Sequence, residues 1–372
     1  MTTGLSSRDR RVVLAIAGAA VVWRWLVAMR TPLPGLDAAF DLWLANELAH
    51  GRWADLGARA AEPWSCLLLA PAIALGASPW LVAQVTACLL GGLVVVPVAA
   101  AAERLRQGAG LPAAVLAMVA AGPVVAAGAG ASVGIGALFV ALATWAVACG
   151  RTGPALFCAA LAAATLGERL LAVDGVERTL RLSIGCAFLL APLAGLPPRP
   201  RPWLWLALAY GASLTIAVAT RPVDWLPTWS PLAAVLAGVG LARLSTRWRE
   251  VLLCVVVAVE CHAAWQAIEP CHAVAERAIG RFVARRLPAG TRVLSDLPRV
   301  LWAAGQRPEA SPAAELVDAA RSAEVAAVVL GPEQARSSTV AASLAGSFAR
   351  YELPTELVDL ATAAGLRVLI RR

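Results

Sequence analysis

Long apolar runs, separated by short segments that carry arginine, dominate this sequence and restrict what it can fold into. About 20 consecutive apolar residues form a helix long enough to cross the hydrocarbon core of a bilayer, which is roughly 30 Å thick. With 59% hydrophobic and 15% charged residues, the chain is not a soluble cytosolic enzyme. We predict an α-helical polytopic membrane protein with about nine spans, placed at Val12–Met29, Trp80–Ala102, Leu111–Ala127, Gly134–Cys149, Pro154–Leu171, Thr179–Leu196, Trp203–Thr220, Trp225–Ala242 and Val251–Ile268.

The arginines between these runs predict the orientation of the chain. Arginine is enriched in the cytoplasmic loops of membrane proteins, and its scatter here excludes a nucleic-acid surface. We therefore expect a multi-pass protein of the bacterial inner membrane, with a cytoplasmic N-terminus and with the loop 30–79 and the C-terminal domain outside. Ser65–Ala77 is short for a span, so ten spans are the alternative. The arginines placed in the cytoplasm are Arg8, Arg10, Arg11, Arg104, Arg106, Arg151, Arg199, Arg201, Arg243, Arg247 and Arg249.

The last hundred residues differ from the rest of the chain because they are polar and contain no run of spanning length. We predict two domains, a transmembrane domain at 1–272 that includes the outward loop and a small extracytoplasmic, periplasmic α/β domain at 273–372. Its expected elements are two helices, Ala273–Leu287 and Ala313–Ala320, and three strands, Arg292–Ser295, Val325–Leu330 and Leu366–Ile370.

The first outward segment contains a predicted helix with two carboxylates. In residues 36–50, Leu36, Phe40, Trp43 and Leu44 share one arc, and Asp37 and Asp41 lie four residues apart on its border. This pattern is typical of a helix that lies on the outer membrane surface with its polar edge in water. The alternative is that the carboxylates serve catalysis.

Several charged residues near the predicted spans have both a functional and a structural interpretation. Arg24 lies within the first span, so it either lines a cavity or extends to the interface. Arg221 either binds phosphate or pairs with Asp224 at the water surface. Glu168 and Arg169, at the outer end of a span, either line a cavity or lie among the lipid headgroups.

Cysteine and histidine occur together twice near the last predicted span, at Glu260–His262 and Glu269–His272. These residue types bind zinc, although known zinc sites have closer spacings. A metal site, a disulfide between Cys261 and Cys271, and plain boundary residues are the three alternatives.

The order of these features resembles the GT-C superfamily of membrane glycosyltransferases, which includes protein O-mannosyltransferases and lipid A aminoarabinose transferases. The resemblance is carried by PLPGLDAAFDLWLANELAHGRW, by the Pro-containing segment that begins EPWSCLLLAPAIALGASPW, and by the outward tail. Asp37 falls at the acidic residue of the family motif, Phe40 at an aromatic position, and Ala45–Gly51 in the stretch that follows. The motif departs from the usual one at Ala38, at Glu62-Pro63-Trp64 and in Gly128–Gly134, which lacks a second acid.

The resemblance implies transfer of a sugar from a polyprenyl-phosphate donor to an outward-facing lipid, glycan or protein acceptor in the cell envelope. Asp37 would be the general base and Asp41 its helper, while Arg24 and Arg221 would contact the phosphate. Glu168 and Arg169 are further substrate-binding candidates. The departures leave a non-catalytic scaffold or lipid-binding protein as the alternative, and a transporter as a third. No cofactor is specified, with a divalent metal ion left open.

Overall fold

The structure is a computed structural model, and the part of the chain that it describes is mostly helical, with one small sheet. It describes residues 5–30, 36–52, 63–120, 131–171, 226–266, 270–288, 291–308, 313–322 and 324–372. By their contacts the residues form two compact units. The helical unit comprises Met1–Met29, Arg59–Leu69 and Leu81–Ala267, and the mixed unit comprises Arg30–Ala58, Ala70–Trp80 and Ile268–Arg372.

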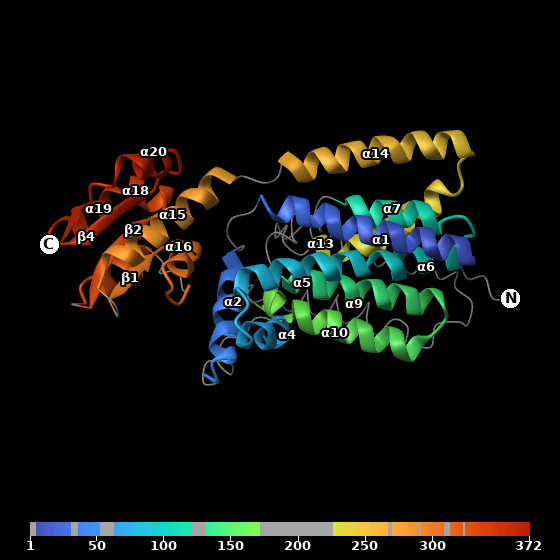
Figure 1. The fold of residues 1–372 in the computed structure, drawn as a ribbon, viewed down its shortest axis with the longest axis horizontal. Coiled ribbons are helices and arrows are strands. Elements are labelled where there is room, and N and C mark those ends of the chain that lie inside the picture. Colours follow the sequence, from blue (N-terminus) through green and yellow to red (C-terminus); the bar gives the residue numbers. More distant parts are fainter. Residues whose placement is uncertain are drawn as a thin grey trace. The chain divides into compact units, whose positions relative to one another are not determined.

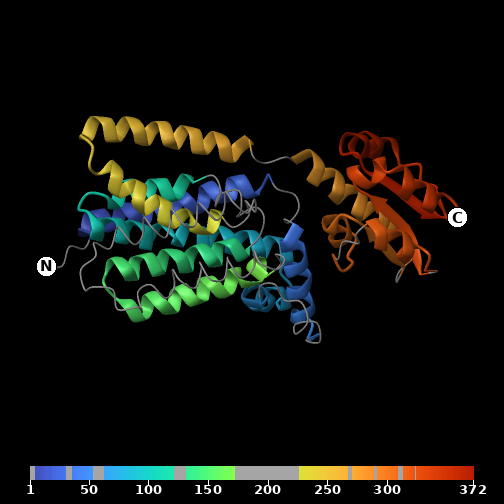
Figure 2. The same ribbon diagram turned by 180° about the vertical axis from the view of Figure 1, so that it is seen from behind.

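The helical unit is a bundle of apolar helices that lie side by side (Figures 1 and 2). Its core consists of small and branched side chains, because alanine and valine fill the facing positions of most helices. Large apolar side chains such as Leu14, Leu89 and Val255 remain exposed, as expected of surfaces that face lipid. The helices of this unit are α1 (Ser7–Ala28), α5 (Pro79–Leu93), α6 (Val95–Leu105), α7 (Gly110–Val119), α9 (Ala131–Ala148), α10 (Thr152–Leu171), α13 (Leu226–Leu241) and α14 (Thr246–Gln266).

Two helical stretches among the described residues are long and apolar enough to cross a membrane, Ser7–Ala28 and Pro79–Leu105. They match the first two predicted spans, and shorter apolar helices occupy the next three. The predicted spans at Thr179–Leu196 and Trp203–Thr220 lie outside the described residues, so the number of spans stays a prediction. The short run at Ser65–Ala77 forms α4 (Pro63–Ala74), a helix of 12 residues with Pro71 inside it.

Close packing in the bundle depends on small residues. In α7, Ala109, Ala113 and Ala117 are buried at intervals of four residues and form a low ridge. In α13, a Cβ atom on Gly238 would lie 2.6 Å from the Cβ of Ala113 and 2.9 Å from its backbone nitrogen. The α7 and α13 backbones can therefore approach each other only because residue 238 has no side chain.

The start of α7 is capped by a carboxylate from the end of α6. The backbone N–H groups of Gly108 and Gly110 both donate to the Glu103 carboxylate at 3.0 Å. An N-terminal turn leaves its N–H groups without helical partners, and a carboxylate satisfies them and the helix dipole together. The Glu103 carboxylate thus holds the turn between α6 and α7 in place.

The C-terminal part of the mixed unit is a four-stranded sheet with helices on both faces (Figure 1). The strand order is β1-β2-β4-β3, with β1 and β2 parallel and the other two pairs antiparallel. The strands are β1 (Arg292–Ser295), β2 (Val325–Leu330), β3 (Phe348–Arg350) and β4 (Arg367–Arg371), and the helices are α15 (Pro270–Arg286), α16 (Pro298–Ala303), α17 (Ala313–Ala320), α18 (Pro332–Arg336), α19 (Ser338–Ala345) and α20 (Thr355–Ala363).

Alternate residues of the strands enter two separate cores. Ala327 and Val329 of β2 pack with α15, α16 and α20, while Val328 and Leu330 pack with α17 and α19. A strand buried on both faces needs an uninterrupted apolar sequence, and VAAVVL provides one. The predicted bounds of β1, β2 and α17 agree with the structure, whereas β3, α16, α18, α19 and α20 were not anticipated.

Most of the predicted outward loop belongs by its contacts to a different unit from the one that the sequence predicted. Its helix α2 (Leu36–Ala49) belongs by contacts to the mixed unit, together with the sheet, and it packs against α16. The prediction had assigned residues 30–79 to the transmembrane domain. The division of the chain into a transmembrane domain at 1–272 and an extracytoplasmic domain at 273–372 stays a prediction.

Asp296 provides a pH-dependent term in the stability of the sheet. It follows β1, and its Oδ1 accepts a hydrogen bond of 2.7 Å from the N–H of Gly331, which follows β2. Burial raises the pKa of Asp296 above its ordinary value of 3.8, and the nearby Glu333 acts in the same direction, although the hydrogen bond partly offsets them. Because the folded carboxyl holds its proton more tightly than the unfolded one, the contribution of Asp296 to stability is fully present below pH 3.8 and is lost as the pH rises through the raised pKa.

Asp296→Asn is therefore expected to raise the apparent melting temperature of the full chain at pH 7. The asparagine oxygen still accepts from Gly331, but no charge has to be buried. The advantage should shrink as the pH falls and vanish below pH 3.8, where aspartate is neutral in both states. Asp296→Ala is the control, because it removes the acceptor and should destabilise by about 1 kcal/mol. Equal melting temperatures for Asp296→Asn and the native chain at pH 7 would contradict this account.

Candidate active site

The two predicted carboxylates lie on α2, but Asp41 is not on a polar edge that faces water. Asp41 is 5% exposed, and Leu42, Leu44 and Leu48 are also buried. The prediction was wrong on this point because leucine and alanine occupy every side of LDAAFDLWLANELA, leaving no continuous stripe for water. Asp37 lies in the first turn of α2, and its side chain is outside the described part of the chain.

The C-terminal end of α2 is held by local hydrogen bonds. Arg52 forms a two-pronged ion pair with Glu47, in which Nη2 donates to Oε1 at 2.6 Å and Nε donates to Oε2. This hydrogen-bonded pairing raises the pKa of Arg52. Nδ1 of His50 also lies 2.7 Å from the carbonyl oxygen of Asn46. Residues at the end of α2 and just after it therefore stabilise this end of the helix through hydrogen bonds to one another.

Arg24 is buried in the helical unit, with 1% of its surface exposed. Its Nη2 donates a hydrogen bond of 2.9 Å to the carbonyl oxygen of Ala117, in the last turn of α7. Nε and Nη1 have no hydrogen-bond partner among the described residues. A Cβ atom on Gly91 would lie 2.6 Å from Nε, so the side chain fits only because α5 has a glycine there. Arg24 is therefore buried within the helical unit and does not extend to its surface.

The other predicted substrate-binding residues cannot be placed with Arg24. Arg221 lies outside the described residues, and Glu168 and Arg169 lie in the last turn of α10 with their side chains outside the described part. Arg24 belongs to the helical unit and Asp41 to the mixed unit. The convergence of these groups on one cavity stays a prediction.

The described residues offer no metal centre, since no group of three or more His, Cys, Asp and Glu side chains among them could hold an ion. Cys261 is a free thiol near the end of α14. The side chain of Cys271 lies outside the described part of the chain, so the Cys261–Cys271 disulfide stays a prediction.

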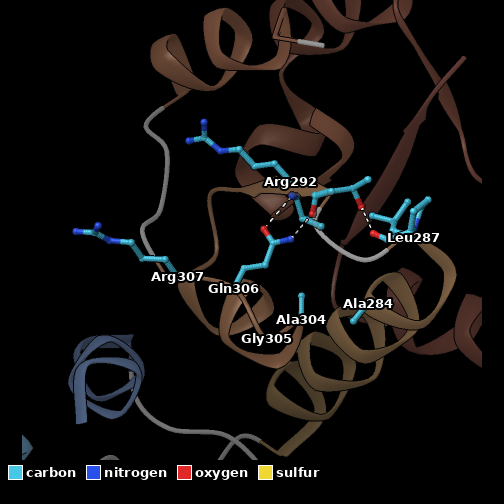
Figure 3. A pocket seen from close by; sticks show the side chains of 10 residues that line it. Ala284, Leu287, Arg292, Ala304, Gly305, Gln306 and Arg307 are labelled. Carbon is cyan, nitrogen blue, oxygen red and sulfur yellow. Dashed lines mark hydrogen bonds between the residues drawn. The ribbon is translucent and has the colours of Figure 1, made fainter. Parts of the chain in front are cut away.

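The mixed unit contains a cavity of about 450 Å³ between the end of α15, the start of β1 and the loop after α16. Gln306 crosses it, and its side chain forms hydrogen bonds to the backbone of Thr291 and Val293 (Figure 3). Arg307 also borders the cavity, but its side chain extends away from Ala304 and Ala284 on the other side of it (Figure 3). It contacts α2, a pairing of distant segments for which the sequence gives no signal.

Comparison with known proteins gives a match in structure without a match in sequence. No protein-family model and no curated protein sequence matches the chain. Two crystal structures of ArnT from Cupriavidus metallidurans do match, each at 15% identity and covering 98% of both chains. The TM-score is 0.60 for ArnT bound to undecaprenyl phosphate and 0.62 for ArnT in the apo state. The chain therefore has the fold of ArnT, a GT-C glycosyltransferase, as its resemblance to that superfamily predicted.

Proposed function

We propose that this protein is a multi-pass inner-membrane glycosyltransferase that transfers a sugar from a polyprenyl-phosphate donor to an outward-facing lipid, glycan or protein acceptor. The observation that carries the proposal is the likeness in fold over 98% of both chains to a protein bound to undecaprenyl phosphate. The buried Arg24 adds support, because two of its guanidinium nitrogens lack hydrogen-bond partners among the described residues. A buried guanidinium in this state favours an anionic ligand such as a phosphate.

In the proposed reaction the acceptor oxygen or nitrogen attacks the anomeric carbon of the donor sugar. The bond from that carbon to the phosphate oxygen breaks, and its electron pair leaves with the polyprenyl phosphate. Asp37 takes the acceptor proton as general base, and Asp41 assists it on the same helix. Arg24 and Arg221 neutralise the charge that develops on the departing phosphate, with Glu168 and Arg169 as further substrate contacts.

A non-catalytic scaffold or lipid-binding protein is the second candidate. In its scaffold form this candidate is favoured by the hydrogen bond from Arg24 to the Ala117 carbonyl oxygen, which gives the arginine a structural use at the C-terminal end of α7. A cation at this end of a helix also complements the helix dipole.

The proposal is tested with the full chain in lipid nanodiscs and a panel of labelled polyprenyl-phosphate sugars. Sugar transfer to added acceptors is measured together with the thermal stabilisation caused by undecaprenyl phosphate. Saturating lipid at 100 times its Kd stabilises the folded state by about 2.7 kcal/mol, which is readily detected. Transfer establishes the enzyme, whereas stabilisation without transfer from any donor favours the lipid-binding protein. If the chain shows neither sugar transfer nor stabilisation by the lipid, both candidates are overturned.

A further inference from the structure

An arginine of the C-terminal sheet region contacts the helix that carries the two predicted carboxylates. The guanidinium carbon of Arg307 lies 5.2 Å from the ring centre of Trp43 and 5.7 Å from that of Phe40. The two rings are themselves 5.9 Å apart and tilted by 37°. A cation within about 6 Å of an aromatic face is attracted by the ring quadrupole, and here two rings act on the same group. Arg307 thus links the loop after α16 to α2, within one compact unit.

The base of Arg307 is fixed by the residue before it. The side-chain oxygen of Gln306 accepts a hydrogen bond of 2.9 Å from the N–H of Val293, and its Nε2 donates to the carbonyl oxygen of Thr291 at 2.8 Å. Gly305, at a φ of 73°, turns the chain out of α16 in a conformation that favours glycine. The loop is therefore tied to the start of β1, and it presents Arg307 from a defined position (Figure 3).

One of the two rings that Arg307 contacts, Phe40, neighbours the acidic position 37 on the surface of α2, and Trp43 lies on the far side of Phe40. Phe40 lies three residues after Asp37 and three before Trp43, while Asp41 lies four residues after Asp37. The backbone of a helix turns as one body, so holding the rings also fixes the rotation of the acidic positions about the helix axis. At a helix radius of roughly 5–6 Å, a rotation of about 10° moves an outer atom by about 1 Å.

We infer that Arg307 is a positioning residue that sets the rotation of α2 and so aims the carboxylates of Asp37 and Asp41 at the acceptor. The inference rests on the proposed transferase function. It gives the C-terminal region a part in the reaction that involves no contact with the substrate. A shift of about 1 Å in a reacting group lowers rates by up to about 100-fold, so a loose α2 slows the chemical step.

The first test compares Arg307→Ala and Arg307→Lys with the native chain. We expect kcat to fall roughly 10- to 100-fold in Arg307→Ala, while KM for the donor stays within about twofold. Lysine keeps the cation and should restore most of the rate. Arg321→Ala is the matched control, because Arg321 is 77% exposed in an ion pair with Asp318 of the same region. Its kcat should equal the native value.

The second test does not depend on activity. Hydrogen exchange of the α2 amides, followed by mass spectrometry, should become roughly fivefold to tenfold faster in Arg307→Ala and stay native in Arg321→Ala. Trp43→Leu removes one ring from the opposite side of the contact and should have the same effect.

The two readouts separate failure of the inference from failure of the proposed function. Unchanged exchange in Arg307→Ala, or faster exchange with an unchanged kcat, overturns the positioning role even if the enzyme is active. Faster exchange in a chain that transfers no sugar from any donor leaves the contact between Arg307 and α2 standing and overturns the transferase. Faster exchange together with the lower kcat supports both.

Discussion

Asp37→Asn is expected to lower kcat for sugar transfer by about 10²- to 10⁴-fold, the usual contribution of a positioned general base. Asparagine has nearly the same shape as aspartate but cannot accept the acceptor proton at neutral pH. The native enzyme should also lose rate as acidic pH protonates the carboxylate, whereas the variant should show no such limb. The measurement is initial rate against pH, with the donor that the native chain uses best.

Two variants on the same helix make the result specific. Asp41→Asn should lower kcat by a smaller factor than Asp37→Asn, because Asp41 is proposed to assist the general base rather than to take the proton itself. Glu47→Gln is the matched control, since Glu47 pairs with Arg52 at the end of α2 and should leave transfer near the native level. Transfer that is unchanged in Asp37→Asn would keep the enzyme but remove Asp37 as its base.

The largest effect on stability is expected for Gly238→Ala. The new Cβ atom would lie 2.6 Å from the Cβ of Ala113 and 2.9 Å from its Cα, so α7 and α13 must move apart. Overpacking of this kind costs typically 1–3 kcal/mol, and more where backbone atoms are involved. We expect the apparent melting temperature of the purified chain to fall by several degrees at a fixed scan rate.

Gly240 offers a control on the same helix. A Cβ atom at this position meets nothing within 4 Å. Alanine is favoured over glycine within a helix by about 1 kcal/mol, so Gly240→Ala should raise the melting temperature. Opposite signs for the two substitutions would establish contact at Gly238 as the cause, whereas a loss in both would point to a general intolerance of α13.

The parts of the fold that could be predicted are those in which one local pattern decides the outcome. Val325–Leu330 reads as a doubly buried strand because every residue is apolar, and glycine and proline follow it. The arginine-flanked apolar runs similarly predict the helices of the bundle. By contrast, β3 has three residues, Phe348–Arg350, which is too short for any periodicity to show. It is a strand because it pairs with β4, a contact that depends on the whole sheet.

The candidate site was predictable in its residue types and not in their surroundings. The acidic spacing at Asp37 and Asp41 is visible in the sequence, but the burial of Asp41 depends on what packs around α2. The choice between an interfacial and a buried Arg24 was likewise decided by the glycine at position 91 and the end of α7. Arg307 shows the limit most clearly, since its contact with Trp43 joins segments from opposite ends of the chain.

The position of β4 has a consequence for how the protein is made. It is the last strand in sequence, yet it lies between β2 and β3 and is bonded to both. While the chain is being synthesised, β3 has no neighbour in the sheet, and the edge of β2 stays open until residues 367–371 emerge. Such an edge can pair with a strand of another chain. During that interval the open edge of β2 is a site at which two nascent chains can aggregate.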